Sequence, residues 1–165
     1  MRRLMALLLW MALAPVVPAS ADPPDLHDYW DGRCKSCHGD AGDFARSTLQ
    51  VEQGRLIGRH HRDRLDEFLQ QHYLADDWVA PVTAMLVAQV TTAPVFKAKC
   101  SGCHGSAADF ARKSLLLRDG VPVGKAGNRP VADYLRAHGG LAPDEIAPMV
   151  ETLKRVLGEV GRGAG

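Results

Sequence analysis

Apolar residues recur at intervals of three and four along much of the chain, the spacing that places them on one face of an α-helix. Strict alternation of apolar and polar residues, which indicates a half-buried strand, appears nowhere. We therefore predict an all-α fold, with helices at 26–37, 64–72, 94–103 and 131–138 and a further helix closing each half. The last helix begins at Pro143 and ends near Leu157, and 54–58 and 120–127 are predicted as loops.

The first 21 residues have the features of a secretory signal peptide. Arg2 and Arg3 precede an apolar stretch, and Ala19-Ser20-Ala21 supplies small residues at the positions that a signal peptidase reads. The apolar stretch is shorter than the roughly 18 residues of a membrane-spanning helix, and it lacks the polar face of a surface helix. We predict cleavage before Asp22 and a periplasmic mature protein, residues 22–165, without a transmembrane segment.

The remainder of the chain consists of two related halves, predicted as domains at 22–91 and 92–165. A shift of 66 positions aligns Asp43-Phe44-Ala45-Arg46 with Asp109-Phe110-Ala111-Arg112. One extra residue in the second half then aligns Ala80-Pro81 with Ala147-Pro148. The join at 91–94 is too short for a free tether, so the halves are predicted to pack together.

Each half contains one C-x-x-C-H motif, the attachment signature of c-type haem. Two thiols one helical turn apart can form thioethers with the two vinyl groups, and the adjacent imidazole is then the proximal iron ligand. A zinc site would require the two C-x-x-C pairs to converge, and a thioredoxin-like pair would require a βαβ pattern, so both are weaker interpretations. The residues predicted to hold two haems are Cys34, Cys37 and His38 in the first half and Cys100, Cys103 and His104 in the second.

With these motifs the chain resembles tandem diheme cytochromes c built from two small class I-like domains. The resemblance covers essentially the whole mature chain and rests on the N-terminal helix, C-x-x-C-H, the glycine-bearing loop and the final pair of helices of each half. It implies two haem c groups, each enclosed by a few short helices. Many class I domains carry a distal Met in a Met-Pro context before the last helix, and neither half of this chain does.

The distal iron ligands are predicted to be His72 and His138. Each lies 34 residues after its proximal histidine and ends a similar predicted helix. Met85 and Met149 do not align with each other and are predicted to pack in the core, with Met149 the alternative ligand of the second iron. The pair His60-His61 is predicted to lie in an exposed loop.

Two arginines also occupy matched positions, eight residues after the proximal histidines. Guanidinium groups suit bidentate contact with carboxylates, so Arg46 and Arg112 are predicted to bind haem propionates. The alternative for each is an ordinary solvated arginine.

The net charge of the mature chain and the predicted iron ligands limit the functions that we expect. Residues 22–165 carry 18 Lys and Arg against 19 Asp and Glu, which disfavours nucleic-acid binding. Irons with two histidine ligands have no open position, so the resemblance implies an electron-transfer protein without catalytic residues. Its expected donor is a membrane quinol-oxidising cytochrome or a dehydrogenase, and its expected acceptor is a periplasmic haem protein or reductase. The alternatives are a peroxidase-like diheme enzyme or gas binder with one open haem, and a cytochrome subunit of a dehydrogenase complex.

Overall fold

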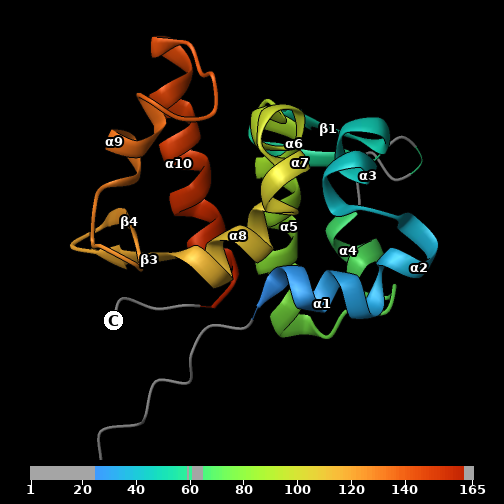
Figure 1. Cartoon of the computed structure of the whole chain (residues 1–165). Helices are drawn as coiled ribbons and strands as arrows, with labels where there is room; N and C mark the ends of the chain where they lie inside the picture. The colour runs from blue at the N-terminus through green and yellow to red at the C-terminus, as the bar shows by residue number, and fades with distance from the viewer. Residues whose placement is uncertain (1–24, 59, 61–64, 162–165) are drawn as a thin grey trace, which may run out of the picture.

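The computed structural model describes residues 25–58, 60 and 65–161. The predicted signal peptide and its cleavage site, and also His61, lie outside these residues. Within them the chain is mostly helical, with two short β-hairpins (Figure 1). No helix in this part of the chain combines the length and the apolar character needed to cross a membrane.

The two halves contain the same elements in the same order, so the internal repeat is present in the structure as well as in the sequence. Three helices are followed by a two-stranded hairpin and then by two more helices. In the first half these are α1 (Leu26–Arg33), α2 (Lys35–His38), α3 (Ala41–Thr48), β1 (Leu49–Glu52), β2 (Arg55–Gly58), α4 (Leu65–Gln70) and α5 (Asp76–Thr91). In the second half they are α6 (Val95–Lys99), α7 (Ser101–His104), α8 (Ala107–Ser114), β3 (Leu115–Arg118), β4 (Val121–Gly124), α9 (Val131–Leu135) and α10 (Pro143–Glu159).

The prediction of an all-helical chain is wrong at two matched places, where β1 pairs with β2 and β3 with β4 in antiparallel hairpins. The segments predicted as loops, 54–58 and 120–127, contain the second strand of each hairpin, β2 or β4. Gln53-Gly54 and Asp119-Gly120 both have positive φ, as two-residue hairpin turns require. Strands of four residues are too short to show a clear alternation, so the X-Gly turn was the available signal.

The helical predictions are confirmed in position, with differences at their ends. The segments predicted as single helices at 26–37 and 94–103 are each divided at the first cysteine of the motif. Helices α3 and α8 were not predicted. Each begins after a capping residue, Asp40 or Ser106, whose side-chain oxygen accepts a hydrogen bond from the backbone N–H of the first turn.

Each half has its own buried apolar cluster, centred on the long helix that closes it. Met85 of α5 and Met149 of α10 are 1% and 2% exposed and belong to these clusters, which confirms their prediction as core residues. Burial of a side chain of this size contributes roughly 1.5–3 kcal/mol. The long helices pack against α3 and α8, and these in turn contact the motif helices α2 and α7.

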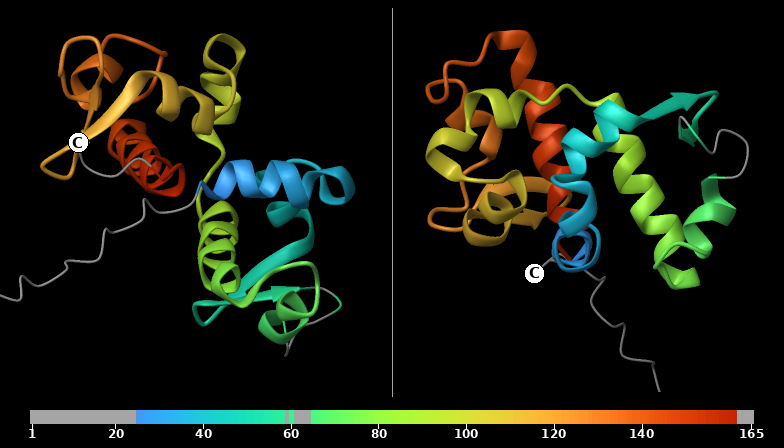
Figure 2. Two further views of the ribbon diagram at one scale, coloured as in Figure 1. Left: turned by 90° about the horizontal axis from the view of Figure 1, so that it is seen from below. Right: turned by 90° about the vertical axis from the view of Figure 1, so that its right-hand side faces the viewer.

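The halves lie side by side and are in contact, as predicted (Figures 1 and 2). On one side, α1 reaches the second half. His27 Nε2 lies 2.9 Å from Glu159 Oε2 of α10, and Arg112 of α8 forms an ion pair with Asp25, the residue before α1. On the other side, Lys97 of α6 forms an ion pair with Asp43 of α3. The first helix of each half thus contacts the third helix of the other half.

Candidate functional site

A cavity of about 490 Å³ lies in the first half, a volume usual for cofactor sites. Cys34, Cys37 and His38 line it from one side, and His72 lines it from another segment of the same half. Most of the remaining wall is apolar. The aromatic and aliphatic side chains on it include Trp30, Phe44, Leu65, Phe68, Leu69 and Val82.

The C-x-x-C-H residues are held by one turn of helix. The backbone N–H of Cys34 donates to Trp30 O at 2.8 Å, and that of His38 donates to Cys34 O at 2.9 Å. The indole Nε1–H of Trp30 then donates to Gly39 O at 2.9 Å, which ties the end of the motif back to α1. Residues three and four apart on a helix share a face, so Cys34, Cys37 and His38 are presented together.

An imidazole faces the motif histidine in both halves. The ring centroids of His38 and His72 are 5.9 Å apart with the rings inclined at 62°, and those of His104 and His138 are 5.9 Å apart at 65°. When each imidazole nitrogen lies about 2 Å from a metal ion, two imidazoles on opposite sides of that ion would have centroids about 6 Å apart. The structure therefore places His72 and His138 opposite the motif histidine of the same half.

Phenylalanine rings orient the histidines. Phe44 lies 4.6 Å from the ring of His38, and Phe110 lies 4.7 Å from the ring of His104. On the opposite side, Phe68 of α4 stacks on His72 at 4.6 Å. The repeated Asp-Phe-Ala-Arg sequence thus supplies the ring that packs against the motif histidine in each half.

Burial sets the protonation of several of these groups. Burial lowers the pKa of His38, and the neighbouring His72 lowers it further, so His38 is held in the neutral form that binds metals. Burial raises the pKa of the Cys34 and Cys100 thiols, although Arg33 and Lys99 act in the opposite direction. A thiol with a raised pKa is unlike the activated thiolate of a disulfide oxidoreductase.

The four cysteines are free, and Cys37 and Cys103 are exposed. Among the described residues no group of three or more His, Cys, Asp or Glu side chains gathers at one point where it could hold a metal ion. Since this part of the chain includes every cysteine, the two C-x-x-C pairs do not converge on a shared zinc site.

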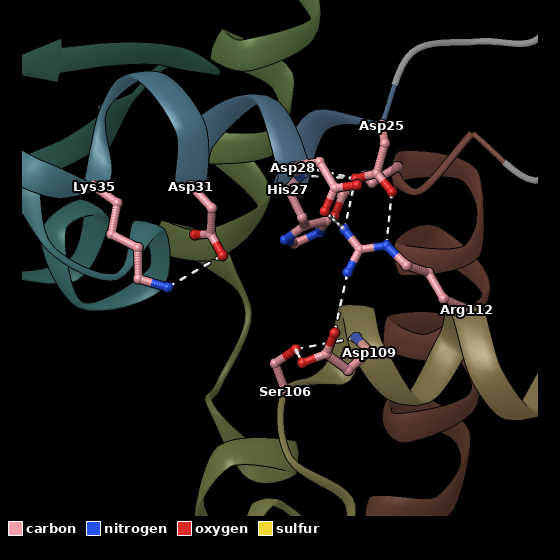
Figure 3. A network of polar contacts seen from close by, with 9 residues as sticks. Asp25, His27, Asp28, Asp31, Lys35, Ser106, Asp109 and Arg112 are labelled. Carbon is pink, nitrogen blue, oxygen red and sulfur yellow. Dashed lines mark hydrogen bonds and ion pairs between the residues drawn. The ribbon is translucent and has the colours of Figure 1, made fainter.

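The two matched arginines have protein partners. Arg46 donates to Asp43 at 3.2 Å and to Gln89 O at 3.4 Å, and it lines a groove between the halves. Arg112 binds both oxygens of Asp25 at 2.7 and 2.8 Å, and it also contacts Asp28 and Asp109 (Figure 3). Propionate binding by these residues stays a prediction with no contact in its support.

Sequence reasoning missed Arg33, which lines the cavity beside Cys34. A signal was present, because a basic residue directly precedes the first cysteine in both halves, with Lys99 before Cys100. Arg33 is therefore the arginine that lines this cavity among the described residues.

The ion pairs of Arg112 with Asp25, Asp28 and Asp109 predict that the free energy of unfolding depends on pH. Burial raises the pKa of Asp25, but the hydrogen bonds and charge of Arg112 outweigh burial and leave that pKa lowered. A lowered folded pKa gives stability that is present above the unfolded pKa of about 3.9 and is lost as the pH falls through the folded pKa. We expect Arg112→Gln to lower the free energy of unfolding by about 1–3 kcal/mol at pH 7 and by clearly less below about pH 3.

Denaturant unfolding of both proteins at pH 7 and pH 3 measures this difference. Arg46→Gln is the matched control, and we expect a cost below about 1 kcal/mol because Asp43, its carboxylate partner among the described residues, is largely exposed. Equal costs for the two variants, or a cost for Arg112→Gln that does not shrink in acid, would contradict the interpretation.

The two halves thus carry the same parts at matched positions: a C-x-x-C-H motif, an imidazole facing it and a phenylalanine ring against the motif histidine. Met149 is packed in the core of the second half, and His60 is exposed, as predicted.

Comparison of the chain with protein-family models, with curated proteins and with solved structures found no match.

Proposed function

We propose that the protein is a periplasmic diheme c-type cytochrome that transfers single electrons between redox partners. The observation that carries the proposal is the pair of imidazole rings 5.9 Å apart in each half, next to the two cysteines of a C-x-x-C-H motif. In this proposal Cys34 and Cys37 attach one haem and Cys100 and Cys103 attach the other. Each half is then a small haem domain.

The residues of the first cavity suit a haem. Its walls are mostly apolar, as a flat apolar ring system requires, and both thiols of the motif lie on them. The neutral state of His38 is the state in which imidazole donates its lone pair to iron. A bound haem would supply one-electron redox chemistry at its iron.

The axial side chains favour a carrier over an enzyme. His38 and His104 would hold the iron from one side, and His72 and His138 from the other, so that substrates and water have no open position. Two imidazole ligands also give haem iron a lower reduction potential than one imidazole and one thioether, since a Met ligand raises that reduction potential. The proposed donor is a membrane quinol-oxidising cytochrome or a dehydrogenase, and the proposed acceptor is a periplasmic haem protein or reductase.

A spectroelectrochemical titration with added carbon monoxide tests the proposed function. The protein is produced with its leader in a host that matures c-type cytochromes. We expect two reversible one-electron steps and no change in the reduced spectrum on addition of carbon monoxide. A reduced protein that binds carbon monoxide without any substitution has an open iron, and the carrier function would then give way to the enzyme or gas binder.

Met149 provides a separate prediction at the second site. We expect Met149→Leu to leave the absorption spectrum and both potentials unchanged, because the side chain is buried in the core and exchange of Met for Leu usually costs under about 1.5 kcal/mol. The titration above measures both quantities. A second potential that shifts strongly in this variant would show that Met149, rather than His138, is the ligand.

A further inference from the structure

The turn that follows the predicted distal histidine differs between the halves. Tyr73 has φ of 62°, in the left-handed region that residues with a Cβ avoid. The matched residue of the second half is Gly139, with φ of 87°. Both halves therefore need a left-handed residue here, and the second half uses the amino acid that adopts this conformation without strain.

Core packing does not explain the tyrosine. Its side chain is 86% exposed, the highest fraction among the large apolar side chains that the structure describes. Its ring meets His72 edge-on, with centroids 5.2 Å apart, and it lines the cavity. An aromatic side chain held in a strained conformation at the surface, beside a functional group, points to a role in binding.

Among the described residues, the charged side chains that follow Tyr73 most closely along the chain are negative. Asp76 and Asp77 are exposed in the first turn of α5, and residues 65–91 contain no Lys or Arg. On the opposite side, Arg33 is exposed and Lys35 is paired with Asp31. Helix α4, which precedes Tyr73, lies on the side of α5 away from the second half, so this surface is not covered by that half (Figures 1 and 2).

We propose that Tyr73, Asp76 and Asp77 form a docking surface through which the first site exchanges electrons with a redox protein whose contact face carries Lys and Arg. This proposal rests on the proposed electron-transfer function. The aromatic ring enters an apolar depression of the partner, and the two carboxylates steer its basic side chains during encounter. The contact between Tyr73 and His72 then links the docked partner directly to the first site.

The second half has only part of this surface. Gly139 replaces the tyrosine and Pro143 occupies the position matched to Asp76, whereas Asp144 matches Asp77. Electrons therefore pass between this partner and the protein through the first site.

Tyr73→Gly is a sharp test because it introduces the residue that the second half has at this position. The substitution relieves backbone strain, so a loss of docking in this variant is not a consequence of unfolding. The probe is a basic mitochondrial cytochrome c. Stopped-flow absorption measures its rate of electron exchange with the intact diheme protein, and calorimetry measures its affinity.

We expect Tyr73→Gly to lower both the exchange rate and the affinity about tenfold, as for a central interface residue. The double variant Asp76→Asn/Asp77→Asn should lower the rate several-fold at low salt and flatten its dependence on ionic strength. The controls in the second half are Tyr134→Ala, another exposed tyrosine, and Asp144→Asn at the position matched to Asp77, for which we expect changes below about twofold, the usual level outside an interface centre.

A Tyr73→Gly protein with wild-type rate and affinity would overturn the docking proposal, and so would an equal loss in Tyr134→Ala. Haem content and visible spectra are measured on the same samples. If the protein has two attached haems and Tyr73→Gly has the wild-type rate and affinity, only the docking surface is contradicted. A sample without haem contradicts the proposed function, and calorimetry still reports whether Tyr73 binds the probe.

Discussion

Replacement of His72 by alanine is expected to create a carbon monoxide site in the first half. In the proposed arrangement His72 fills the position facing His38, and a methyl group cannot bind iron in its place. Cys34, Cys37 and His38 remain, so the haem stays attached with one axial position open. His138→Ala should have the same effect in the second half.

Titration of the reduced proteins with carbon monoxide measures the effect as a stoichiometry. We expect no binding in the wild type, one molecule per chain in each single variant and two in the double variant. His60→Ala is the control, because His60 is exposed and lies away from the cavity wall. A His72→Ala protein that binds no carbon monoxide would show that His72 is not an iron ligand.

Removal of the haem attachment is expected to unfold most of the chain. Each half has about 70 residues, a size at which an apolar core alone seldom gives a stable fold. Without haem, the mostly apolar wall of the cavity in the first half would face water instead of a cofactor, at a cost of about 25 cal/mol per Å² of apolar surface. The haem therefore completes the core as well as the site.

The variant for this test has serine at Cys34, Cys37, Cys100 and Cys103. Far-ultraviolet circular dichroism should show loss of most of the helical signal, and urea should produce no cooperative transition. The control replaces only Cys34 and Cys37, and hydrogen exchange should then show protected amides in α10 but not in α5. Native helicity and cooperative unfolding of the fourfold variant would contradict the role of haem in folding.

Much of the fold was predictable because the sequence is repeated. The alignment of the halves paired His72 with His138, and the structure places each opposite a motif histidine at the same distance. Periodicity also located the long helices, since many apolar residues contribute to that signal. The hairpins were missed because four-residue strands carry too few residues for a pattern, although Asp119-Gly120 is a typical turn sequence.

The parts of the site that were not predictable depend on contacts between distant segments. Arg112 binds Asp25 across 87 positions of sequence, and no local pattern relates these residues. The exposure and left-handed backbone of Tyr73 are likewise invisible in the sequence, where an aromatic residue after a histidine suggests only packing. Matched positions thus predicted what the halves share, and the structure was needed for what distinguishes them.

Intact-mass spectrometry of the protein exported from a host that matures c-type cytochromes tests the central claim most directly. The expected mass is that of residues 22–165 plus two covalently attached haems, and replacement of both cysteines of one motif should remove one haem. A haem-free chain recovered from such a host, with its cysteines free or joined in disulfides, would contradict the diheme cytochrome and the function proposed from it.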